Sequence, residues 1–455
     1  MSTPTIHLPL PVHTGKGLGG VSRDFSSRPV ELLTEIFQTH GDVAKVRFFA
    51  NQYFYLVSHP DYVRHVFANN SGNYTKKPHP AFVLLSYVMG EGLVTSDGDL
   101  WTRQRKLIQP AFTKQRVAGY ARLMTEATER MLHRWERKPG VFNVDADMMG
   151  LTLDIVGQTL FGLDITANGG RVGAAFTQVS EEFAKLLGHP LGPVLIKLPF
   201  VPRVRRFNAS MRTLDDVVTG IITDRRQSAT DRGDLLSLLM AARDDTGAGM
   251  DDQQLRDEVM TLLLSGHETT ADALTWTFYL LAQHPEVLTR LEDEVDTVLS
   301  GRLPTVADLP ALSYTKMVVQ EALRLYPPIY LYARWGHQPD EIGGYHTPTD
   351  ATITVCPYVV HRHPEFWDAP ERFDPERFLP NAVAERHHYA WIPFSGGPRQ
   401  CVGVHFALME AQLLLATIVS RVRLRMAHCL PVRPSTAMTL RPSGGLPMIA
   451  TARSS

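Results

Sequence analysis

A single cysteine carries the strongest chemical signal in this chain. Cys401 lies in the run FSGGPRQCVG at residues 394–403, and the 455 residues contain only three cysteines. Glycines on both sides free the backbone to turn tightly and to approach a flat ligand. An apolar helix is expected from Val404 to Val422, so the sulfur would lie near a helix N-terminus, where the dipole lowers the pKa of a thiol. A thiolate held in this way is suited to bind haem iron.

A second unusual run, SGHETT at residues 265–270, falls inside a long helical pattern from about Asp251 to Gln283. An aspartate can cap the start of this helix, and Pro285 ends it. A glycine, an acid and two threonines are poor choices for a helix interior. Such a conflict is expected where function overrides foldability. A kinked core helix with solvated polar residues would give the same pattern.

The spacing of Phe394, Gly397, Arg399, Cys401 and Gly403 resembles the haem-binding loop of the cytochrome P-450 monooxygenases. The resemblance implies that Cys401 is the axial ligand of a haem b iron and that Gly403 belongs to the cofactor-binding loop. It further implies that Phe394 packs near the sulfur and that Arg399 meets a haem propionate. The alternative is a buried free cysteine in an ordinary loop.

The run at residues 265–270 is similar to the oxygen-activation motif of the same family. By this match Thr269 would hydrogen-bond the bound dioxygen, and Glu268 would relay protons from solvent. Ser265 departs from the pattern, because the family more often has alanine or glycine there. Its hydroxyl would lie near the edge of the substrate.

The sequences EALR at 321–324 and FDPERF at 373–378 also resemble family motifs. Taken alone, a glutamate and an arginine three residues apart are most often a weak surface pair. The resemblance instead implies one buried ionic triad of Glu321, Arg324 and Arg377 behind the cysteine loop, with a structural role.

Two further motifs are matched to the haem propionates. Trp101 and Arg105 lie one helical turn apart in the run WTRQR, so their side chains project together. Arg334 is a third candidate by position. Three cations around two carboxylates would hold the cofactor in register. For Arg334 the alternative is an ordinary surface arginine.

The resemblance also places apolar segments around a distal pocket, among them the loop from Phe82 to Leu93 and the segment from Phe183 to Leu191. The expected pocket residues are Phe82, Leu85, Tyr87, Val88, Leu187, Leu264, Ser265, Ile329, Tyr330 and Leu446. Such a lining suits a lipophilic substrate of fatty-acid, terpenoid or steroid type. Plain core packing is equally compatible with each residue. Breaks in the helical pattern suggest a mobile lid at Gly188, Pro190, Gly192 and Pro193.

The resemblance runs from about Val43 to Met448, with residues 1–42 only loosely matched. It implies one large, mainly α domain over residues 1–455, with small β-sheets. The overall shape would be a triangular prism in which the haem lies between the long central helix and the cysteine loop. Strand patterns at Val43–Phe49 and Tyr53–Ser58 predict a hairpin, and another strand is expected at Thr352–Cys356.

Composition excludes several classes of protein. A net charge of −1 argues against nucleic-acid binding. Cys356, Cys401 and Cys429 give no even disulfide framework, which fits a reducing compartment. Residues 1–20 lack both the apolar core of a signal peptide and the length of a membrane anchor. A soluble, bacterial, cytoplasmic protein is therefore expected.

No cluster-type cysteine spacing and no dinucleotide loop of the G-x-G-x-x-G kind occurs in the sequence. Electrons must then come from an external ferredoxin or flavodoxin with its reductase. We expect an acidic carrier to dock on a basic helix, although a solvated helix would carry the same charges. Its residues would be Arg103, Lys106, Lys114 and Arg116.

The function implied is a monooxygenase that inserts one oxygen atom from O2 into a C–H bond of a lipophilic small molecule, by hydroxylation or epoxidation. One alternative is a peroxide-driven haem-thiolate peroxygenase. Such relatives tend to lack the acid–alcohol pair at Glu268 and Thr269. A second alternative is a non-catalytic haem sensor, for which no output module is left in the chain.

Overall fold

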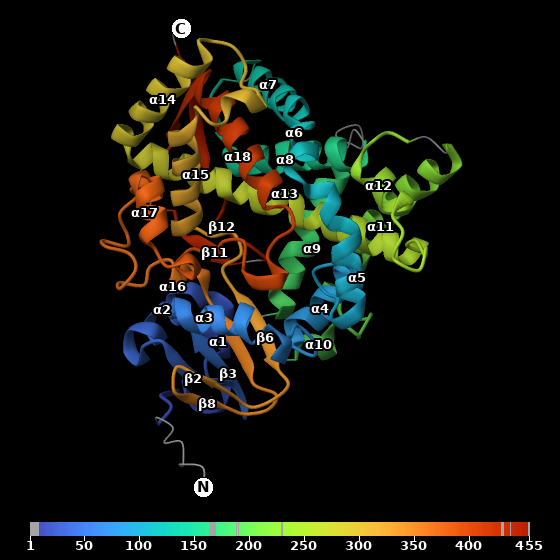
Figure 1. The fold of residues 1–455 in the computed structure, drawn as a ribbon, viewed down its shortest axis with the longest axis vertical. Coiled ribbons are helices and arrows are strands. Elements are labelled where there is room, and N and C mark those ends of the chain that lie inside the picture. Colours follow the sequence, from blue (N-terminus) through green and yellow to red (C-terminus); the bar gives the residue numbers. More distant parts are fainter. Residues whose placement is uncertain are drawn as a thin grey trace.

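The computed structural model describes residues 9–137, 139–162, 170–187, 189, 191–228, 231–428, 432–436 and 438–453. Helix α13 crosses the middle of the molecule, with α15 and α18 packed beside it, and the largest sheet lies at one end (Figure 1). One large apolar core joins these helices to α8, α9 and α7.

The helices of the N-terminal half are α1 Ser22–Ser27, α2 Pro29–His40, α3 Pro60–Arg64, α4 Pro80–Met89, α5 Gly98–Ile108, α6 Lys114–Ala118, α7 Ala121–Arg137, α8 Val144–Phe161, α9 Arg171–Leu187, α10 Gly192–Leu195 and α11 Pro202–Ser228. Those that follow are α12 Leu235–Ala241, α13 Asp252–Gln283, α14 Pro285–Leu299, α15 Ser313–Leu325, α16 Pro357–Val360, α17 Pro380–Glu385 and α18 Val404–Val419.

The largest sheet has the strand order β1-β2-β3-β9-β6-β4. Its strands are β1 Val12–His13, β2 Val43–Phe49, β3 Gln52–Val57, β4 Tyr74–Thr75, β6 Tyr332–Gly336 and β9 Thr352–Val355. β2 and β3 pair antiparallel, which confirms the predicted hairpin. Three small sheets contain β5 Val141–Asn143, β7 Asp340–Ile342, β8 Tyr345–Thr347, β10 Val422–Met426, β11 Pro434–Thr436, β12 Leu440–Pro442 and β13 Pro447–Ala452.

The central helix forms as its end signals predict. The Asp251 side chain caps α13 by accepting a hydrogen bond from the N–H of Gln254 at 2.7 Å. Pro285 begins the next helix, and 32 residues at ~1.5 Å rise span roughly 48 Å. A Cβ on Gly266 would lie 3.2 Å from Val156 of α8, so this glycine lets the two helices pack closely.

The helix after the cysteine is shorter than predicted. α18 ends at Val419 rather than Val422, because Val422 begins strand β10 and pairs with Ala452 of β13. Residues 422–426, VRLRM, alternate between apolar and polar side chains, and this strand pattern marks the change from helix to strand. Among the described residues, no helix combines the length and the apolar character needed to cross a bilayer.

Candidate active site

The loop of Cys401 is held by backbone bonds on both sides of the sulfur. The N–H of Cys401 donates to the carbonyl of Phe394 at 3.0 Å, and the ring of Phe394 lies edge-on to Trp391. Gly397 has φ +64°, and a Cβ there would lie 1.9 Å from the carbonyl of Phe67, so only glycine fits. The Tyr332 hydroxyl donates to the loop carbonyl of Pro393 at 3.0 Å.

Cys401 as a residue is exposed, and yet the surrounding protein desolvates its thiol. These two facts agree if the sulfur faces a hollow inside the protein rather than bulk water. Burial raises the pKa of the Cys401 thiol, while the N–H of Gly403 and the charge of Arg105 lower it. Gly403 precedes α18, so the sulfur lies at the N-terminus of that helix, as predicted. Both groups favour the thiolate that an iron ligand requires.

Arg105 lies beside this loop. Its Nη1 donates to the carbonyl of Gln400 at 2.8 Å, and burial lowers its pKa. The guanidinium therefore supports the cysteine loop in this structure, apart from the other two arginines that the sequence assigned to the propionates.

Those arginines, Arg334 and Arg399, come together with Lys76 around one carboxylate, Asp97. Arg399 pairs with Asp97 at 2.5 Å and stacks 4.2 Å over the ring of Trp101. The backbone N–H groups of Lys76 and Lys77 also donate to Asp97.

The cations of this group are not balanced by the described residues. Arg334 is only 6% exposed, and it donates a hydrogen bond to the carbonyl of Ala333 at 2.9 Å. Burial, followed by the charge of Arg399, lowers the pKa of Arg334 to about 10. Burial and the charges of both arginines hold the pKa of Lys76 well below its usual range. Three cations thus share one described carboxylate.

A haem group fits these residues. Its two propionates would balance the two uncompensated charges of the Lys76–Arg334–Arg399 group. Its iron would meet the sulfur of Cys401. Sequence reasoning missed Lys76, because nothing in the spacing TKKP reveals which lysine turns inward. The contact depends on the carbonyl of Val94, to which the Lys76 Nζ donates at 2.5 Å.

The middle of α13 stays helical through the unusual run. The hydroxyl of Thr269 donates to the carbonyl of Ser265 at 2.9 Å, and that of Ser265 donates to Thr261 at 2.6 Å. Such bonds to the preceding turn accommodate hydroxyl side chains within a helix. Thr269 is half-buried, and neither side chain interrupts the helix.

Glu268 is turned away from solvent. It is 5% exposed, and its Oε1 accepts hydrogen bonds from the hydroxyls of Ser180 and Thr439, both at 3.0 Å. Ser180 belongs to α9, and Thr439 immediately precedes β12. The predicted relay acid is therefore connected to two other elements by hydroxyl groups, which the sequence could not show.

The three residues of the predicted triad lie together. Glu321 pairs with Arg324 at 2.6 Å and with Arg377 at 3.5 Å, and the first two are fully buried. Arg324 also donates to the carbonyls of His361, Pro370 and Arg372. The cluster ties α15 to the segment that leads toward the cysteine loop.

The predicted pocket residues are dispersed over several environments. Val88, Leu264 and Leu446 are buried in the main core, and Tyr330 packs in a small cluster with Val30 and Leu440. Phe82, Leu85, Leu187, Ser265 and Ile329 are half-buried.

Tyr87 is 42% exposed and therefore does not belong to the packed core. Helix α4 is apolar on nearly every face, and its pattern therefore could not identify the buried side. Of the predicted lid, Gly192 and Pro193 begin the short helix α10, whereas Gly188 and Pro190 lie outside the described residues.

The predicted basic helix needs correction. Arg103 and Lys106 belong to α5, but Lys114 and Arg116 belong to α6. Arg103 pairs with Asp244 at 2.5 Å and Lys106 with Asp245 at 2.6 Å. The segment between α12 and α13 supplies both acids, a long-range contact that the sequence does not reveal.

Comparisons with known proteins define the class of this site. The sequence profile of the family described as cytochrome P-450 matches residues 16–446. The cyclooctatin synthase of Streptomyces melanosporofaciens is 38% identical over 96% of this chain and 95% of the relative. The cyclooctat-9-en-7-ol 5-monooxygenase of the same organism is 37% identical, over 88% of this chain and 85% of the relative. The pentalenene oxygenase of Streptomyces avermitilis is 34% identical, over 94% of this chain and 93% of the relative.

The crystal structure of the cytochrome P-450DA haem domain superimposes with a TM-score of 0.90 at 27% identity, covering 99% of both chains. The fold and the cysteine site thus define a haem-dependent oxidoreductase that incorporates oxygen from O2. This chain belongs to the cytochrome P-450 family and is a monooxygenase. The predicted family and fold class are confirmed.

Proposed function

We propose that this monooxygenase hydroxylates a terpenoid, with haem b as its cofactor and electrons from a separate carrier protein. The observation that carries the proposal is the set of three relatives named for terpenoid oxidation, each matched over most of its length. The apolar helices α4 and α9 pack on each other, and α4 also packs on α13, so the side of α13 that they cover is suited to a lipophilic substrate.

The haem, when bound, supplies the chemistry that activates O2 and inserts oxygen into a C–H bond. The protein's part is to hold and protect that chemistry. Cys401 would bind the iron through its thiolate, and Arg334, Arg399 and Lys76 would hold the propionates. Thr269 orients a proton toward the reacting oxygen, and Glu268 resupplies that proton.

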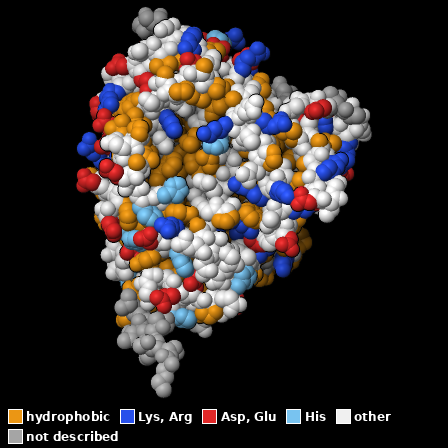
Figure 2. Space-filling model, viewed as in Figure 1, with side chains coloured by type: hydrophobic (Ala, Val, Ile, Leu, Met, Phe, Trp, Pro, Cys, Tyr) orange, Lys and Arg blue, Asp and Glu red, His pale blue; other side chains and the backbone are white. Residues whose placement is uncertain are grey.

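We further propose that the carrier docks on the face that bears the cysteine loop. Figure 2 shows this face: hydrophobic side chains gather over α15 and α18, and Lys and Arg side chains lie among and beside them. Of the four basic residues that the sequence suggested, Arg103 and Lys106 already pair with acidic side chains. The exposed Lys114 and Arg116 are therefore best placed to meet an acidic ferredoxin or flavodoxin.

The cofactor assignment is tested by the absorption spectrum of the purified protein, reduced with dithionite and exposed to carbon monoxide. A strongly red-shifted Soret band, of the thiolate type, is expected, and it should disappear in Cys401→Ala. Cys356→Ala is the matched control, because burial raises the pKa of the Cys356 thiol to about 12 and this sulfur is fully buried. A thiolate band that survives in Cys401→Ala would overturn the ligand assignment.

The activity is tested with a panel of cyclic terpenes under 18O-labelled O2, with a ferredoxin, its reductase and NADPH. Mass spectrometry should find one labelled oxygen atom in the product. A parallel reaction with hydrogen peroxide alone tests the peroxygenase alternative, and efficient turnover only in that reaction would replace the present proposal. Turnover of fatty acids or steroids in preference to every terpene would overturn the substrate class.

A further inference from the structure

Asp272 lies one helical turn after Glu268 on α13 and has no role in the site described above. It is 0% exposed. No described residue donates to either of its carboxyl oxygens within hydrogen-bond geometry. An unpaired buried acid costs free energy, so it signals either a missing partner or a function.

Two polar side chains connect Asp272 to its surroundings. The hydroxyl of Thr439, which donates to Glu268, also lies near enough to Asp272 to favour its ionised form. Arg441, two residues further along the chain, acts on Asp272 through its charge. Thr439 therefore donates to Glu268 and has the carboxyl group of Asp272 as a further neighbour.

Asp145, near the start of α8, completes this group of acids. Its Oδ1 is buried and has no described hydrogen-bond partner. It interacts electrostatically with Glu268, Asp272 and Arg441. His267 is another titratable neighbour of Glu268, and its ring bonds the carbonyl of Leu263 at 2.8 Å.

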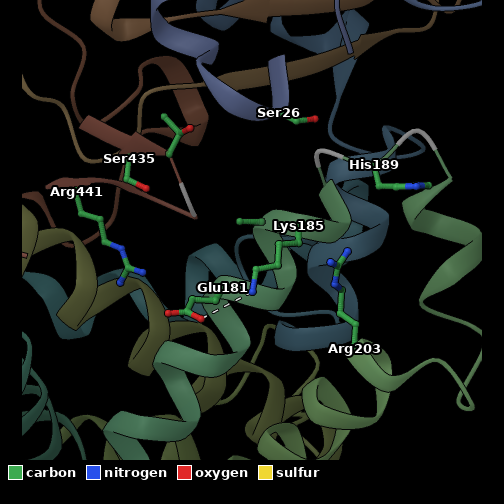
Figure 3. Close-up of a pocket in the computed structure, with 9 residues that line it drawn as sticks. Ser26, Glu181, Lys185, His189, Arg203, Ser435 and Arg441 are labelled. Carbon is green, nitrogen blue, oxygen red and sulfur yellow. Dashed lines mark ion pairs between the residues drawn. The ribbon is translucent and has the colours of Figure 1, made fainter. Parts of the chain in front are cut away.

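Arg441 lines a cavity of about 550 Å³. Figure 3 shows Arg441 extending into it from β12, toward Glu181 and Lys185 of α9. Glu181 directly follows Ser180, the second hydroxyl that donates to Glu268. The two segments that contact Glu268 thus also line this cavity. Its remaining lining residues are Ser26, Ala184, His189, Arg203, Ser435 and Thr436.

We propose that Asp272, assisted by Asp145 and Arg441, is a proton-holding residue that reloads Glu268 from water in this cavity. The inference rests on the proposed role of Glu268. When Glu268 has given up its proton, Thr439 passes its hydroxyl proton to the Glu268 carboxylate and takes one from the Asp272 carboxyl. Asp272 then regains a proton from cavity water near Arg441, and bulk solvent returns a proton to that water. No electron moves in any of these steps.

The acid–base properties agree with this geometry. Burial raises the pKa of Asp272 well above its usual range, and the charges of Glu268 and Asp145 raise it further. Burial also raises the pKa of Asp145. A carboxyl group that keeps its proton near neutral pH can donate it, whereas an ordinary aspartate has already lost it.

The test compares Asp272→Asn with Glu268→Gln and with Glu410→Gln in the haem-loaded enzyme. Glu410 is the matched control, because it is also fully buried and its two carboxyl oxygens also lack a described hydrogen-bond partner. It packs against Thr270, not against Glu268. The readouts are product formed per NADPH, hydrogen peroxide released, and the solvent deuterium isotope effect between pH 6 and 9.

Glu268→Gln should reduce product per NADPH about 10²-fold, and Asp272→Asn about tenfold with a larger isotope effect. Glu410→Gln should match the wild type. If Asp272→Asn matches the wild type while Glu268→Gln is impaired, this inference is wrong and the role of Glu268 stands. If neither variant is impaired, both assignments are wrong. Equal impairment of Asp272→Asn and Glu410→Gln would show a packing effect and overturn the inference.

A second variant covers the case in which Asp272→Asn does not fold. Arg441 is half-buried at the cavity, so Arg441→Met should be tolerated. Without this cation the pKa values of Asp145 and Asp272 rise, because Arg441 lowers both. The decline of product per NADPH with rising pH should therefore move to higher pH. An unchanged pH profile would overturn the inference.

Discussion

Two threonines on α13 make the same hydrogen bond but are expected to differ in function. The hydroxyl of Thr269 donates to Ser265, and that of Thr277, two turns later, donates to Ala273 at 2.7 Å. Both bonds satisfy the hydroxyl within the helix and add little to its stability. Thr277 is fully buried in the core, whereas Thr269 is half-buried.

We predict that Thr269→Ala keeps haem and substrate binding but loses product. The proton that the hydroxyl orients is missing, so about tenfold more of the reductant should end as hydrogen peroxide. Measuring NADPH, product and peroxide in one reaction checks this expectation. Thr277→Ala removes an equivalent hydroxyl and should behave as the wild type. Tight coupling of NADPH to product in Thr269→Ala would refute the assigned role.

At the scale of the elements, buried charges decide how helices connect to loops. Arg324 joins α15 to three carbonyls while pairing with Glu321, and both side chains are fully buried. By contrast, Arg290 of α14 and Glu376 form a pair at 2.9 Å that is about half exposed. If the buried Arg324–Glu321 pair is broken, water cannot solvate the remaining charge. If the exposed Arg290–Glu376 pair is broken, water can.

The two pairs should therefore differ in their contribution to stability. Arg324→Gln removes the closer of the two cations that pair with the buried Glu321, leaving only Arg377 at 3.5 Å, and should lower the free energy of unfolding by about 3–5 kcal/mol. Arg290→Gln should cost at most ~1 kcal/mol. Urea denaturation of the haem-loaded variants measures both values. Similar losses for the two variants would contradict the assignment of the buried cluster as a structural connection.

The buried carboxyl group of Glu410, on α18, should make the stability of the fold depend on pH. Burial raises the pKa of this carboxyl to about 8, while contact with Thr270 lowers it slightly. The folded state then keeps its proton up to about pH 8, whereas the unfolded state releases it near pH 4.5. In this window the folded state binds more protons, so this group's contribution to stability falls as pH rises.

Glu410→Gln should therefore gain stability relative to the wild type between pH 5 and pH 8, by a few kcal/mol at most. Thermal unfolding at a series of pH values measures the difference. Glu182→Gln is the contrast, because this buried carboxylate pairs with Arg203 and Arg206 and its replacement should destabilise throughout the range. A Glu410→Gln curve parallel to that of the wild type would show that the group titrates normally.

At the scale of the whole molecule, the face around the cysteine loop combines apolar and basic side chains (Figure 2). The net charge of −1 offers no general attraction to an acidic carrier, so local charges must guide its approach. Lys114 and Arg116 are exposed on α6, which packs against α18.

Reversing both charges, in Lys114→Glu with Arg116→Glu, should slow reduction by ferredoxin and flatten its dependence on salt. Stopped-flow reduction at several ionic strengths measures both effects. The control reverses Lys197 and Arg205, two exposed cations near α10 and α11, and so changes the net charge equally. Identical slowing in both double variants would indicate a net-charge effect and remove α6 from the interface.

Local signals in the sequence predicted much of the fold and part of the site. The cap at Asp251, the proline at 285 and the strand patterns near the N-terminus predicted elements that the structure contains. The boundary at Val422 was missed although the alternation VRLRM at residues 422–426 signals a strand. The exposure of Tyr87 could not be predicted, because a continuous apolar run has no period. Lys76 was missed for a different reason, since its contacts come from distant segments.

The sequence by itself determined the central helix, and it predicted the cysteine ligand and the threonine, because each depends on neighbouring residues whose types limit the backbone. Only the tertiary structure decided which partners the charged side chains have. It gathered Lys76, Arg334 and Arg399 around Asp97, paired Arg103 and Lys106 with a remote acidic segment, and bonded Glu268 to Ser180 and Thr439. Charged and hydroxyl groups interact through space over several ångströms, so residues far apart in the chain fix their roles only once the chain has folded.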